Sequence, residues 1–294
     1  MPVGCANLDH QQPPGAGGPA RSVLARQRHT YILERIRGDG AVRVGELARD
    51  LGVSDMTVRR DLELLHQQGL LEKVHGGATV SNGSSLFEPG FVVKSELQLE
   101  EKASIALAAS ELVVPGMAIA LSAGTTTYAL ARRLIDVEGL TVVTNSVPVA
   151  DVLYRLGRAD QTIIVTGGVR TPSDALVGAF AVSALRTIHV DLVFMGVHGM
   201  DPHSGFTTPN LLEAETDRAL VDAGRRLIVV ADHTKFGIIG ISSIARLDQA
   251  DVLITDAGLH DDARTALRHE VRELVIVEAG KTSTEDAAPA PLPR

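Results

Sequence analysis

The sequence predicts two domains of different fold class, an N-terminal α+β winged helix-turn-helix and a C-terminal α/β domain built on a mostly parallel sheet. Two observations predict this organisation. Residues 44–68 form two short amphipathic segments that pivot on Gly52, and from about residue 96 apolar strands alternate with helical stretches. The length of 294 residues also suits about two ordinary domains.

The two segments around Gly52 are predicted to be helices that each bury one apolar stripe. The stripes have helical spacing: Val44, Leu47, Ala48 and Leu51 in the first segment, and Val58, Leu62 and Leu65 in the second. Gly52 can adopt the positive φ that ends a helix, and Ser54 is a favoured N-cap for the next. An ordinary helical hairpin with a solvated basic face has the same pattern, so these residues alone leave both interpretations open.

The second helix carries a polar face that is typical of DNA recognition. At 100° per residue, Met56, Arg60, Glu63 and Gln67 lie opposite the apolar stripe, with Thr57 and Arg59 on its flanks. Arginines that point outward near the start of a second helix favour a helix-turn-helix. The candidate DNA-binding residues of this helix and its N-cap are Ser54, Met56, Thr57, Arg59, Arg60 and Glu63.

The flanking segments favour a winged helix over the bare hairpin. Residues 22–37 form a longer helix that residues 38–40 end, and residues 70–74 and 78–80 are β-like runs around a Gly-Gly turn. Three helices and a hairpin make a winged helix. In the wing, Lys73 and His75 are expected to contact backbone phosphate or the minor groove.

At these residues the sequence resembles the DeoR family of bacterial transcriptional regulators. The N-terminal signature of that family matches Arg28, Ile32, Ile36, Ser54 and the run 57–62, and the turn at residues 75–78 also fits. The resemblance implies a DNA-binding regulator, most often a repressor, that controls sugar uptake or catabolism genes by binding double-stranded operator DNA.

The formal net charge of −8 is unevenly distributed along the chain. Residues 21–80 hold 10 Lys and Arg against 8 Asp and Glu, whereas the rest of the chain holds 18 against 28. A domain of net charge about +2 offers few phosphate contacts. We therefore expect DNA binding to depend on a few placed arginines, doubled by homo-oligomerisation.

Composition divides the chain into five segments. Residues 1–20 are a Gly-, Pro- and Gln-rich arm predicted to be disordered, 21–80 the winged helix, 81–95 a linker, 96–279 the second domain, and 280–294 a disordered tail. The arm lacks the plan of a signal peptide, and no apolar run approaches 20 residues. The protein is expected to be cytoplasmic, with no membrane contact.

The second domain is predicted to be a layered sheet with helices on both faces. A helix at 96–113 precedes strands at 117–121, 141–144, 161–166, 191–195, 227–231, 252–255 and 274–277, most of them separated by helices. In such a sheet, ligands bind beyond the carboxyl ends of the strands. Five of those ends carry polar or glycine-rich loops, at 122–127, 144–146, 166–168, 196–201 and 232–237.

The first of these loops suits an anion. Small residues, hydroxyls and a helix N-terminus follow the strand directly, an arrangement that favours phosphate or carboxylate. A threonine N-cap without a ligand explains the same residues equally well.

These loops resemble the second domain of the DeoR family, a Rossmann-like sensor domain that is similar to ribose-5-phosphate isomerase and usually senses a phosphorylated sugar. Carried over position by position, the resemblance implies a ligand site made of Ser122, Gly124, Thr125, Thr126, Thr144, Asn145, Gly167, Gly168, His198, Glu213 and Lys235. Two positions depart from the family pattern: Ser122-Ala123 replaces Asp-Ser, and His198 replaces a shorter polar residue. The identity of the sugar is therefore open.

Metal, catalytic and dinucleotide sites are less favoured interpretations of the residues in this domain. His198, Asp201 and His203 cluster without a third anchored histidine, so no metal is expected. Glu213 and Glu215 could form a catalytic pair of carboxylates, but residues two apart on a helix point to different sides, so this pair is not expected. No G-x-G-x-x-G follows a strand, so no dinucleotide or other cofactor is expected.

Three functions remain after these exclusions. The first is a ligand-responsive transcriptional regulator without enzymatic activity. The second is an isomerase-like enzyme with a DNA-binding appendage, but the stretch 198–201 and the loop at 205–207 lack one of the isomerase's acids and its loop lysine. The third, an architectural DNA-binding protein, leaves the strand-end loops unexplained.

Overall fold

The computed structural model describes residues 25–67, 70–80 and 90–280. The predicted arm at 1–20, most of the predicted linker and all of the predicted tail except Gly280 lie outside the described residues. Within them, no helix is both long enough and apolar enough to cross a membrane.

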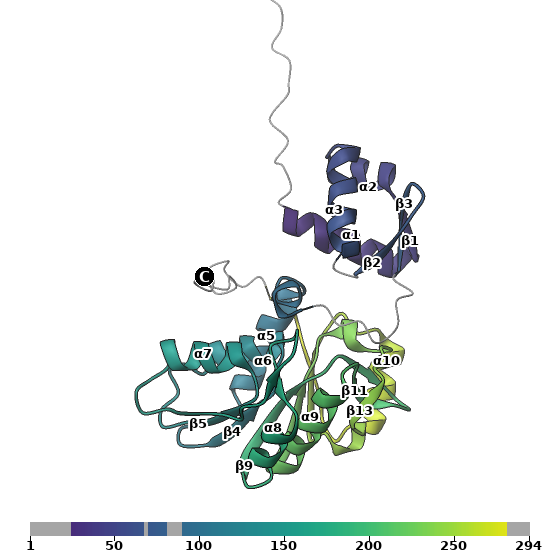
Figure 1. Ribbon diagram of the computed structural model, residues 1–294. Helices are drawn as coiled ribbons and strands as arrows, with labels where there is room; N and C mark the ends of the chain where they lie inside the picture. Colours follow the sequence, from purple (N-terminus) through teal and green to yellow (C-terminus); the bar gives the residue numbers. More distant parts are fainter. Residues whose placement is uncertain (1–24, 68–69, 81–89, 281–294) are drawn as a thin grey trace, which may run out of the picture.

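The N-terminal domain is a winged helix. It contains α1 (Ala25–Asp39), β1 (Ala41–Arg43), α2 (Val44–Leu51), α3 (Asp55–Gln67), β2 (Leu71–Val74) and β3 (Gly77–Val80), as Figure 1 shows. The strands form an antiparallel sheet of order β1-β3-β2. The strand β1 was not predicted, and α1 runs two residues past the predicted end at residue 37, because Gly40 rather than Gly38 takes the positive φ (76°) that turns the chain.

The predicted apolar stripes of α2 and α3 build the core of this domain. Val44, Leu47, Val58, Leu62 and Leu65 are buried together with residues of α1 and the wing. The turn between the helices has the expected caps: Gly52 has φ 63° and ends α2, and the backbone N–H of Thr57 donates to the Ser54 hydroxyl at 3.2 Å.

One ion pair inside this domain ties its first helix to its third. The Arg28 Nε donates to the Asp61 carboxylate at 2.7 Å, and His29 Nε2 lies 3.1 Å from the same group. The Asp61 side chain is buried, and its charge raises the pKa of Arg28 above the ordinary value through a side-chain hydrogen bond. Arg28, a residue of the family signature, therefore positions α3.

The C-terminal domain is the expected Rossmann-like α/β fold. All seven predicted strands are present, as β4 (Ala118–Leu121), β5 (Thr141–Thr144), β6 (Thr162–Val165), β9 (Val190–Gly196), β12 (Gly224–Val230), β14 (Val252–Asp256) and β15 (Leu274–Val277). They pair in parallel in the order β15-β14-β12-β9-β4-β5-β6.

Helices cover both faces of this sheet (Figure 1). One face packs against α5 (Leu99–Ser110), α6 (Thr125–Arg133) and α7 (Val147–Leu156), and the other against α8 (Ala179–Leu185), α9 (Leu211–Ala223) and α10 (Asp261–Glu270). Strand β9 shows the alternation that this requires. Leu192 and Phe194 are buried in the first layer, and Val193 and Met195 in the second.

Several elements of this domain were not predicted from the sequence. A hairpin of β7 (Val169–Arg170) and β8 (Leu176–Val177) and an antiparallel sheet of β10 (Gly199–Asp201), β11 (Gly205–Thr208) and β13 (Ser242–Ala245) lie beside the main sheet. These strands are two to four residues long and, apart from the two-residue β8, are not continuous apolar runs. Two single-turn 3₁₀ helices, His233–Lys235 and Leu247–Gln249, complete the fold.

The end of the predicted linker at 81–95 contains a helix. Residues Phe91–Ser95 form a helix, α4, and the Phe91 ring packs edge-on against Tyr128 of α6, with ring centroids 5.5 Å apart. The following helix starts at Leu99 instead of residue 96 because Gln98 adopts a left-handed backbone conformation, φ 49°. The α4 helix therefore packs on the C-terminal domain.

Candidate functional site

The exposed face of α3 carries the side chains that the sequence assigned to DNA. Met56 is 66% exposed, Arg59 and Arg60 are exposed, and together with Glu63 they border a groove that the wing closes on its other side. The groove has a volume of about 340 Å³ and is lined on the wing by Lys73, Val74, Gly76 and Gly77. The winged helix thus presents one continuous surface made of α3 and the wing, in which charged side chains border an apolar groove.

Two of the predicted DNA-binding residues hold the start of α3. The Ser54 hydroxyl lies 2.9 Å from the Thr57 hydroxyl and accepts the Thr57 backbone N–H. Ser54 is exposed and Thr57 half-buried, so these hydroxyls fix the N-terminus of the helix at the protein surface. A helix N-terminus attracts a phosphate group.

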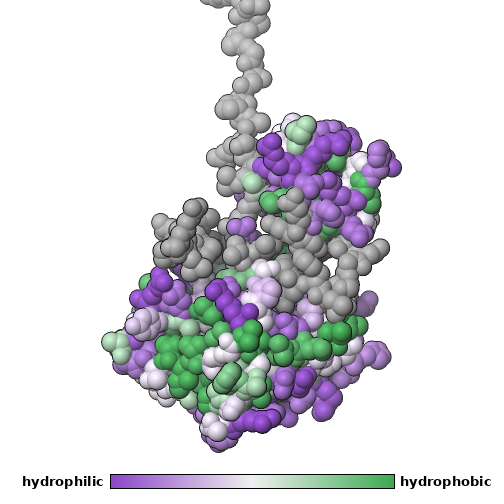
Figure 2. Space-filling view, viewed as in Figure 1, coloured by the Kyte–Doolittle hydropathy of each residue, from purple (hydrophilic) through white to green (hydrophobic). Residues whose placement is uncertain are grey.

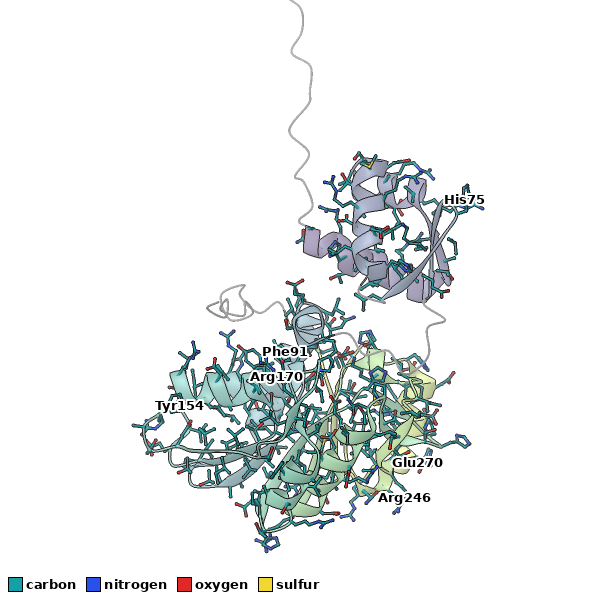
Figure 3. All side chains as sticks on the ribbon, viewed as in Figure 1. His75, Phe91, Tyr154, Arg170, Arg246 and Glu270 are labelled. Atoms are coloured by element: carbon teal, nitrogen blue, oxygen red, sulfur yellow. The ribbon has the colours of Figure 1, made fainter. Side chains whose placement is uncertain are left out.

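The wing is tied to α3 by an ion pair. Lys73 of β2 pairs with the Glu63 carboxylate of α3, and both side chains are nearly half exposed. His75 lies in the turn between β2 and β3 and points outward at the tip of the wing (Figure 3). Lys73 therefore sets the position of the wing relative to α3 as well as supplying charge.

The candidate ligand site of the sensor domain lies where the order of the sheet reverses. From β4 the chain adds β5 and β6 on one side and β9, β12, β14 and β15 on the other. The loops that leave β4 and β9 therefore diverge and leave a crevice at the carboxyl edge of the sheet. A cavity of about 50 Å³ is found there, lined by Lys94, Ala123, Gly124, Thr125, Thr126, Ser173, Gly196, Val197, His198, Thr208, Glu213, Asp217, Lys235 and Ile244.

The loop after β4 is held open by a set of internal hydrogen bonds. The Thr127 hydroxyl donates to the Ser122 carbonyl at 2.7 Å, the Ser122 hydroxyl accepts the Gly196 N–H at 2.9 Å, and the Asn145 side-chain oxygen accepts the Ala123 N–H at 2.9 Å. Gly124 has φ 155°, a conformation that favours glycine. The N-terminus of α6 consequently faces the cavity with its first backbone N–H groups, which have no partner within the helix.

Six of the eleven predicted ligand-binding residues line this cavity: Gly124, Thr125, Thr126, His198, Glu213 and Lys235. They come from α6, the β9–β10 connection, α9 and the 3₁₀ turn after β12. The structure therefore brings together residues that lie more than 100 positions apart in the sequence.

The other five predicted residues do not line the cavity. Thr144 is buried and donates to the Leu121 carbonyl at 2.7 Å, while Ser122 and Asn145 hold the β4 loop. Gly168 packs against the backbone of β8, where a Cβ atom would lie 2.4 Å from the Val177 oxygen, and Gly167 precedes it at φ 73°. These residues contact the backbone of the loops and strands around the cavity instead of facing it. The Nδ2 of buried Asn145 has no hydrogen-bond partner among the described residues.

Four polar side chains of the cavity were not predicted from the sequence: Lys94, Ser173, Thr208 and Asp217. Ser173 and Thr208 come from segments without a recognisable period. Both bind the Glu213 carboxylate: Ser173 and Thr171 donate to its Oε1, and Thr208 donates to its Oε2 at 3.4 Å. Glu213 is buried while Glu215 is exposed, so the two carboxylates point to different sides as expected.

A group of charges lies behind the cavity. Burial would raise the pKa of Asp232, but Lys235, Lys102 and a hydrogen bond from the Thr234 hydroxyl lower it below its ordinary range. Burial lowers the pKa of Lys102 to about 7, and its ammonium donates to the carbonyls of Lys94 and Leu97 at 2.6 Å each. Asp232 therefore stays ionised, and its negative charge attracts the ammonium groups of Lys235 and Lys102.

The residues that suggested a metal or an acid catalyst have structural contacts. The Asp201 carboxylate accepts the backbone N–H groups of His203 and Ser204 at 2.9 Å each and so caps a turn. Asp201 does not line the cavity, and His198, which does, donates its backbone N–H to the Thr207 carbonyl. Among the described residues there is no group of three side chains that could hold a metal ion.

Comparison with known proteins identifies both domains. Residues 28–83 match the model of the DeoR-like helix-turn-helix domain, and residues 97–257 match the model of the DeoR C-terminal sensor domain.

Relatives that match most of the chain are transcriptional regulators. The HTH-type transcriptional regulator YgbI of Escherichia coli K12 is 38% identical over 257 residues, which cover 87% of this chain and 99% of that protein. The glycerol-3-phosphate regulon repressor of the same organism is 32% identical over 232 residues, 79% of this chain and 90% of that protein.

Among solved structures, a ribose-5-phosphate isomerase in complex with phospho-erythronic acid aligns with 46% of this chain and 52% of its own. The identity is 15% and the TM-score 0.35, so this likeness carries no statement about activity.

Proposed function

The chain belongs to the DeoR family of transcriptional regulators, and on that premise we propose that it is a repressor of carbohydrate metabolism genes that responds to a phosphorylated sugar or a related small anionic metabolite. The observation that carries this proposal is the cavity at the sheet reversal, where six residues implied by the family pattern converge.

The phosphate group of the ligand would lie at the N-terminus of α6. The backbone N–H groups of Thr125 and Thr126 suit an anion there, and the α6 helix dipole adds favourable charge. Lys94 and Lys235 supply two ammonium groups to the same cavity. These features support an anionic ligand over a neutral sugar.

The sugar hydroxyls would lie on the opposite wall. Glu213 is a buried carboxylate held by Thr171, Ser173 and Thr208, and carboxylates are strong acceptors for hydroxyl groups. His198 and Asp217 line the same wall. We propose that Glu213 selects among sugar phosphates, because its acceptor atoms have a fixed position.

The ligand site is connected to the DNA-binding domain through α4 and α5. Lys94 lines the cavity from α4, the first element after the linker, and the Leu97 side chain packs against the core of the winged helix. Lys102 binds the carbonyls of both residues. Ligand binding at Lys94 would change the energy of this connection, which is what a ligand requires in order to shift DNA affinity.

An isomerase activity is the less favoured function. Sugar isomerisation needs a carboxylate base and an acid or electrophile over the sugar carbons. Asp201 is engaged in capping a turn outside the cavity, and the loop at 205–207 forms part of strand β11. Relatives at 32–38% identity are named as transcriptional regulators. We propose binding without turnover.

The experiment that tests this function starts with selection of bound sequences from random DNA by the full chain. Binding of the selected DNA is then measured with phosphorylated sugars, the matching unphosphorylated sugars and inorganic phosphate. The proposal expects one phosphorylated sugar to change DNA affinity by about 5–150-fold, the range of ordinary coupling energies. Turnover of that sugar phosphate, or no change in DNA affinity across the panel, would overturn it.

A further inference from the structure

The outer edge of the main sheet is an unusual surface for a parallel α/β fold. Strand β6 is the last strand on its side, and among residues 25–67, 70–80 and 90–280 it pairs only with β5. Three of its four residues are exposed, including Ile164 at 38% and Val165 at 46%. Val169, just beyond the strand, is 66% exposed. These residues, 162–165 and Val169, are called the edge surface below.

The opposite edge of the sheet shows how such a strand is usually protected. The four residues of β15 are half-buried, and charged residues flank the strand directly, with Arg272 and Glu273 before it and Glu278 after it. Charges at an edge discourage further pairing. The edge surface has no charged residue between Asp160 and Arg170. The edge surface therefore lacks the flanking charges that discourage another strand from pairing with β15.

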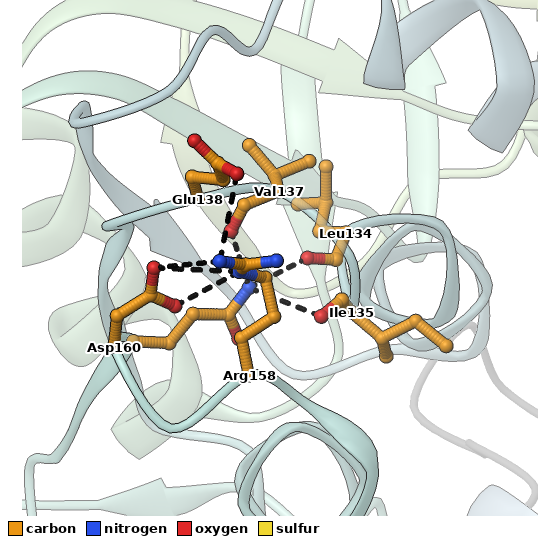
Figure 4. A network of polar contacts seen from close by, with 7 residues as sticks. Leu134, Ile135, Val137, Glu138, Arg158 and Asp160 are labelled. Carbon is orange, nitrogen blue, oxygen red and sulfur yellow. Dashed lines mark hydrogen bonds and ion pairs between the residues drawn. The ribbon is translucent and has the colours of Figure 1, made fainter.

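The turn that leads into the edge surface is held by side-chain contacts. Gln161 donates its side-chain N–H groups to the carbonyls of Leu134 and Val137 at 2.8 Å each, and Arg158 pairs with Asp160 and Glu138. Figure 4 shows this network around the turn that leads into β6. A rigid strand loses little conformational entropy when another strand pairs with it.

The hydrogen-bonding groups of this edge can be assigned from the ladder to β5. The N–H groups of Thr162 and Thr166 donate to the carbonyls of Leu140 and Thr144, so they point inward. Successive residues of a strand alternate, and the main-chain groups of Ile163 and Val165 therefore point outward. Two outward residues separated by one are the unit of antiparallel pairing.

We propose that the edge surface is the site of self-association, where β6 of one chain pairs antiparallel with β6 of a second copy about a two-fold axis through Ile164. In this register the main-chain groups of Ile163 meet those of Val165 in the second copy, and the two Ile164 side chains face each other. The inference rests on the proposed function, because a regulator with one weakly charged winged helix needs a second copy to read two half-sites.

A second copy fits this surface better than a different partner. The strand has no charged residue, so two copies can pair without placing like charges opposite each other. For the same reason, the strand has no group that would bind a charged partner. Apolar residues of the neighbouring helix α7 extend the surface: Tyr154 is 84% exposed and Leu156 is 59% exposed. Figure 2 shows apolar side chains gathered on a broad face of the sensor domain. An isologous contact buries such a patch on both copies at once.

The experiment uses the full chain and a pair of charge variants, Ile164→Lys and Ile164→Glu. Sedimentation equilibrium should give the wild type a mass of two or more chains, and each variant alone half the wild-type mass, because like charges meet at the axis. An equal mixture of the two variants should regain the wild-type mass, because Lys then faces Glu. Leu107→Lys, a similarly exposed position on α5, is the matched control and should keep the wild-type mass.

A second variant tests the main chain separately from the side chains. Val165→Pro removes an N–H group that points outward, and proline is tolerated at the free side of an edge strand. It should also halve the mass, with a melting temperature near that of the wild type.

Four outcomes would overturn the proposal: a wild-type mass of one chain, unchanged masses for both Ile164 variants, a mixture that stays dissociated, or dissociation of the Leu107→Lys control. Slow exchange of the Ile163 and Val165 amides in a chain of monomer mass would show that another segment of the same chain covers the edge, and would overturn it too. The proposed sensing function is judged separately. Dissociated Ile164→Lys should still gain thermal stability with the phosphorylated sugar.

Discussion

The ammonium of Lys102 donates hydrogen bonds of 2.6 Å to the main-chain carbonyls of Lys94 and Leu97. One buried side chain of α5 thereby fixes the end of the cavity-lining helix α4 and the connection to α5, where Leu97 packs against the core of the winged helix. Its charge also acts on Asp232, which lies next to the ligand cavity. The ligand site and the interdomain connection share this residue.

Because of Lys102, the free energy of unfolding should depend on pH above neutrality. Its folded-state pKa of about 7 lies below the ordinary value of 10.5, because burial disfavours the charged form. Between those two values the unfolded chain holds more protons, so the free energy of unfolding should rise by about 1 kcal/mol per pH unit. Lys102→Met should remove this rise. Denaturant unfolding of both proteins at pH 7, 8.5 and 10 measures the difference, and equal slopes would contradict the assignment.

Lys235 should be required for the effect of phosphorylated sugar on DNA binding, but not for DNA binding itself. Lys235 lines the cavity and lies far in the sequence from the winged helix. Lys235→Ala should bind the selected DNA as the wild type does, but lose the response to phosphorylated sugar. Arg225→Ala, whose side chain is 81% exposed on β12, is the control and should respond normally. A normal response in Lys235→Ala would place the ligand elsewhere.

The two exposed arginines of α3 should differ in what they recognise. Arg60 lies opposite the buried stripe and is expected to reach a base edge, so Arg60→Ala should cost about 1–3 kcal/mol on the selected sequence and relax specificity there. Arg59 lies on the flank, and Arg59→Ala should weaken all sequences and flatten the salt dependence. Titrations of specific and random DNA at several salt concentrations separate the two effects. Equal losses on both DNAs for Arg60→Ala would refute its role in base recognition.

The Asp61 carboxylate should stabilise the winged helix. It is buried and holds Arg28 at 2.7 Å, so Asp61→Asn removes the negative charge from a nearly buried ion pair. Breaking such a pair typically costs about 3 kcal/mol. Hydrogen exchange of α1 and α3 amides should become faster, while that of the sensor-domain sheet should not change. Unchanged exchange in α1 would mean that the pair contributes little.

The elements with a regular residue pattern could be predicted from the amino-acid sequence. The two helices around Gly52 follow from an apolar stripe at helical spacing, a left-handed glycine and a serine cap, which are local properties of the chain. The seven strands of the main sheet are apolar runs bounded by turns, and a buried parallel strand has to be such a run. Five of the six predicted cavity residues follow strand ends that meet at one edge, and the sixth, Glu213, was implied by the resemblance to the DeoR family.

Which loops meet around the cavity, and which predicted residues lie outside it, depends on the order of the strands in the folded sheet. The reversal of strand order between β4 and β9 sets Thr125, His198 and Lys235 around one cavity, while Gly168 is drawn away to β8. Lys94 lies on α4, a helix of five residues that is too short to show an apolar period. The exposed edge of β6 depends on sheet order as well, because an apolar strand looks the same in sequence whether it lies at the centre of a sheet or at its border.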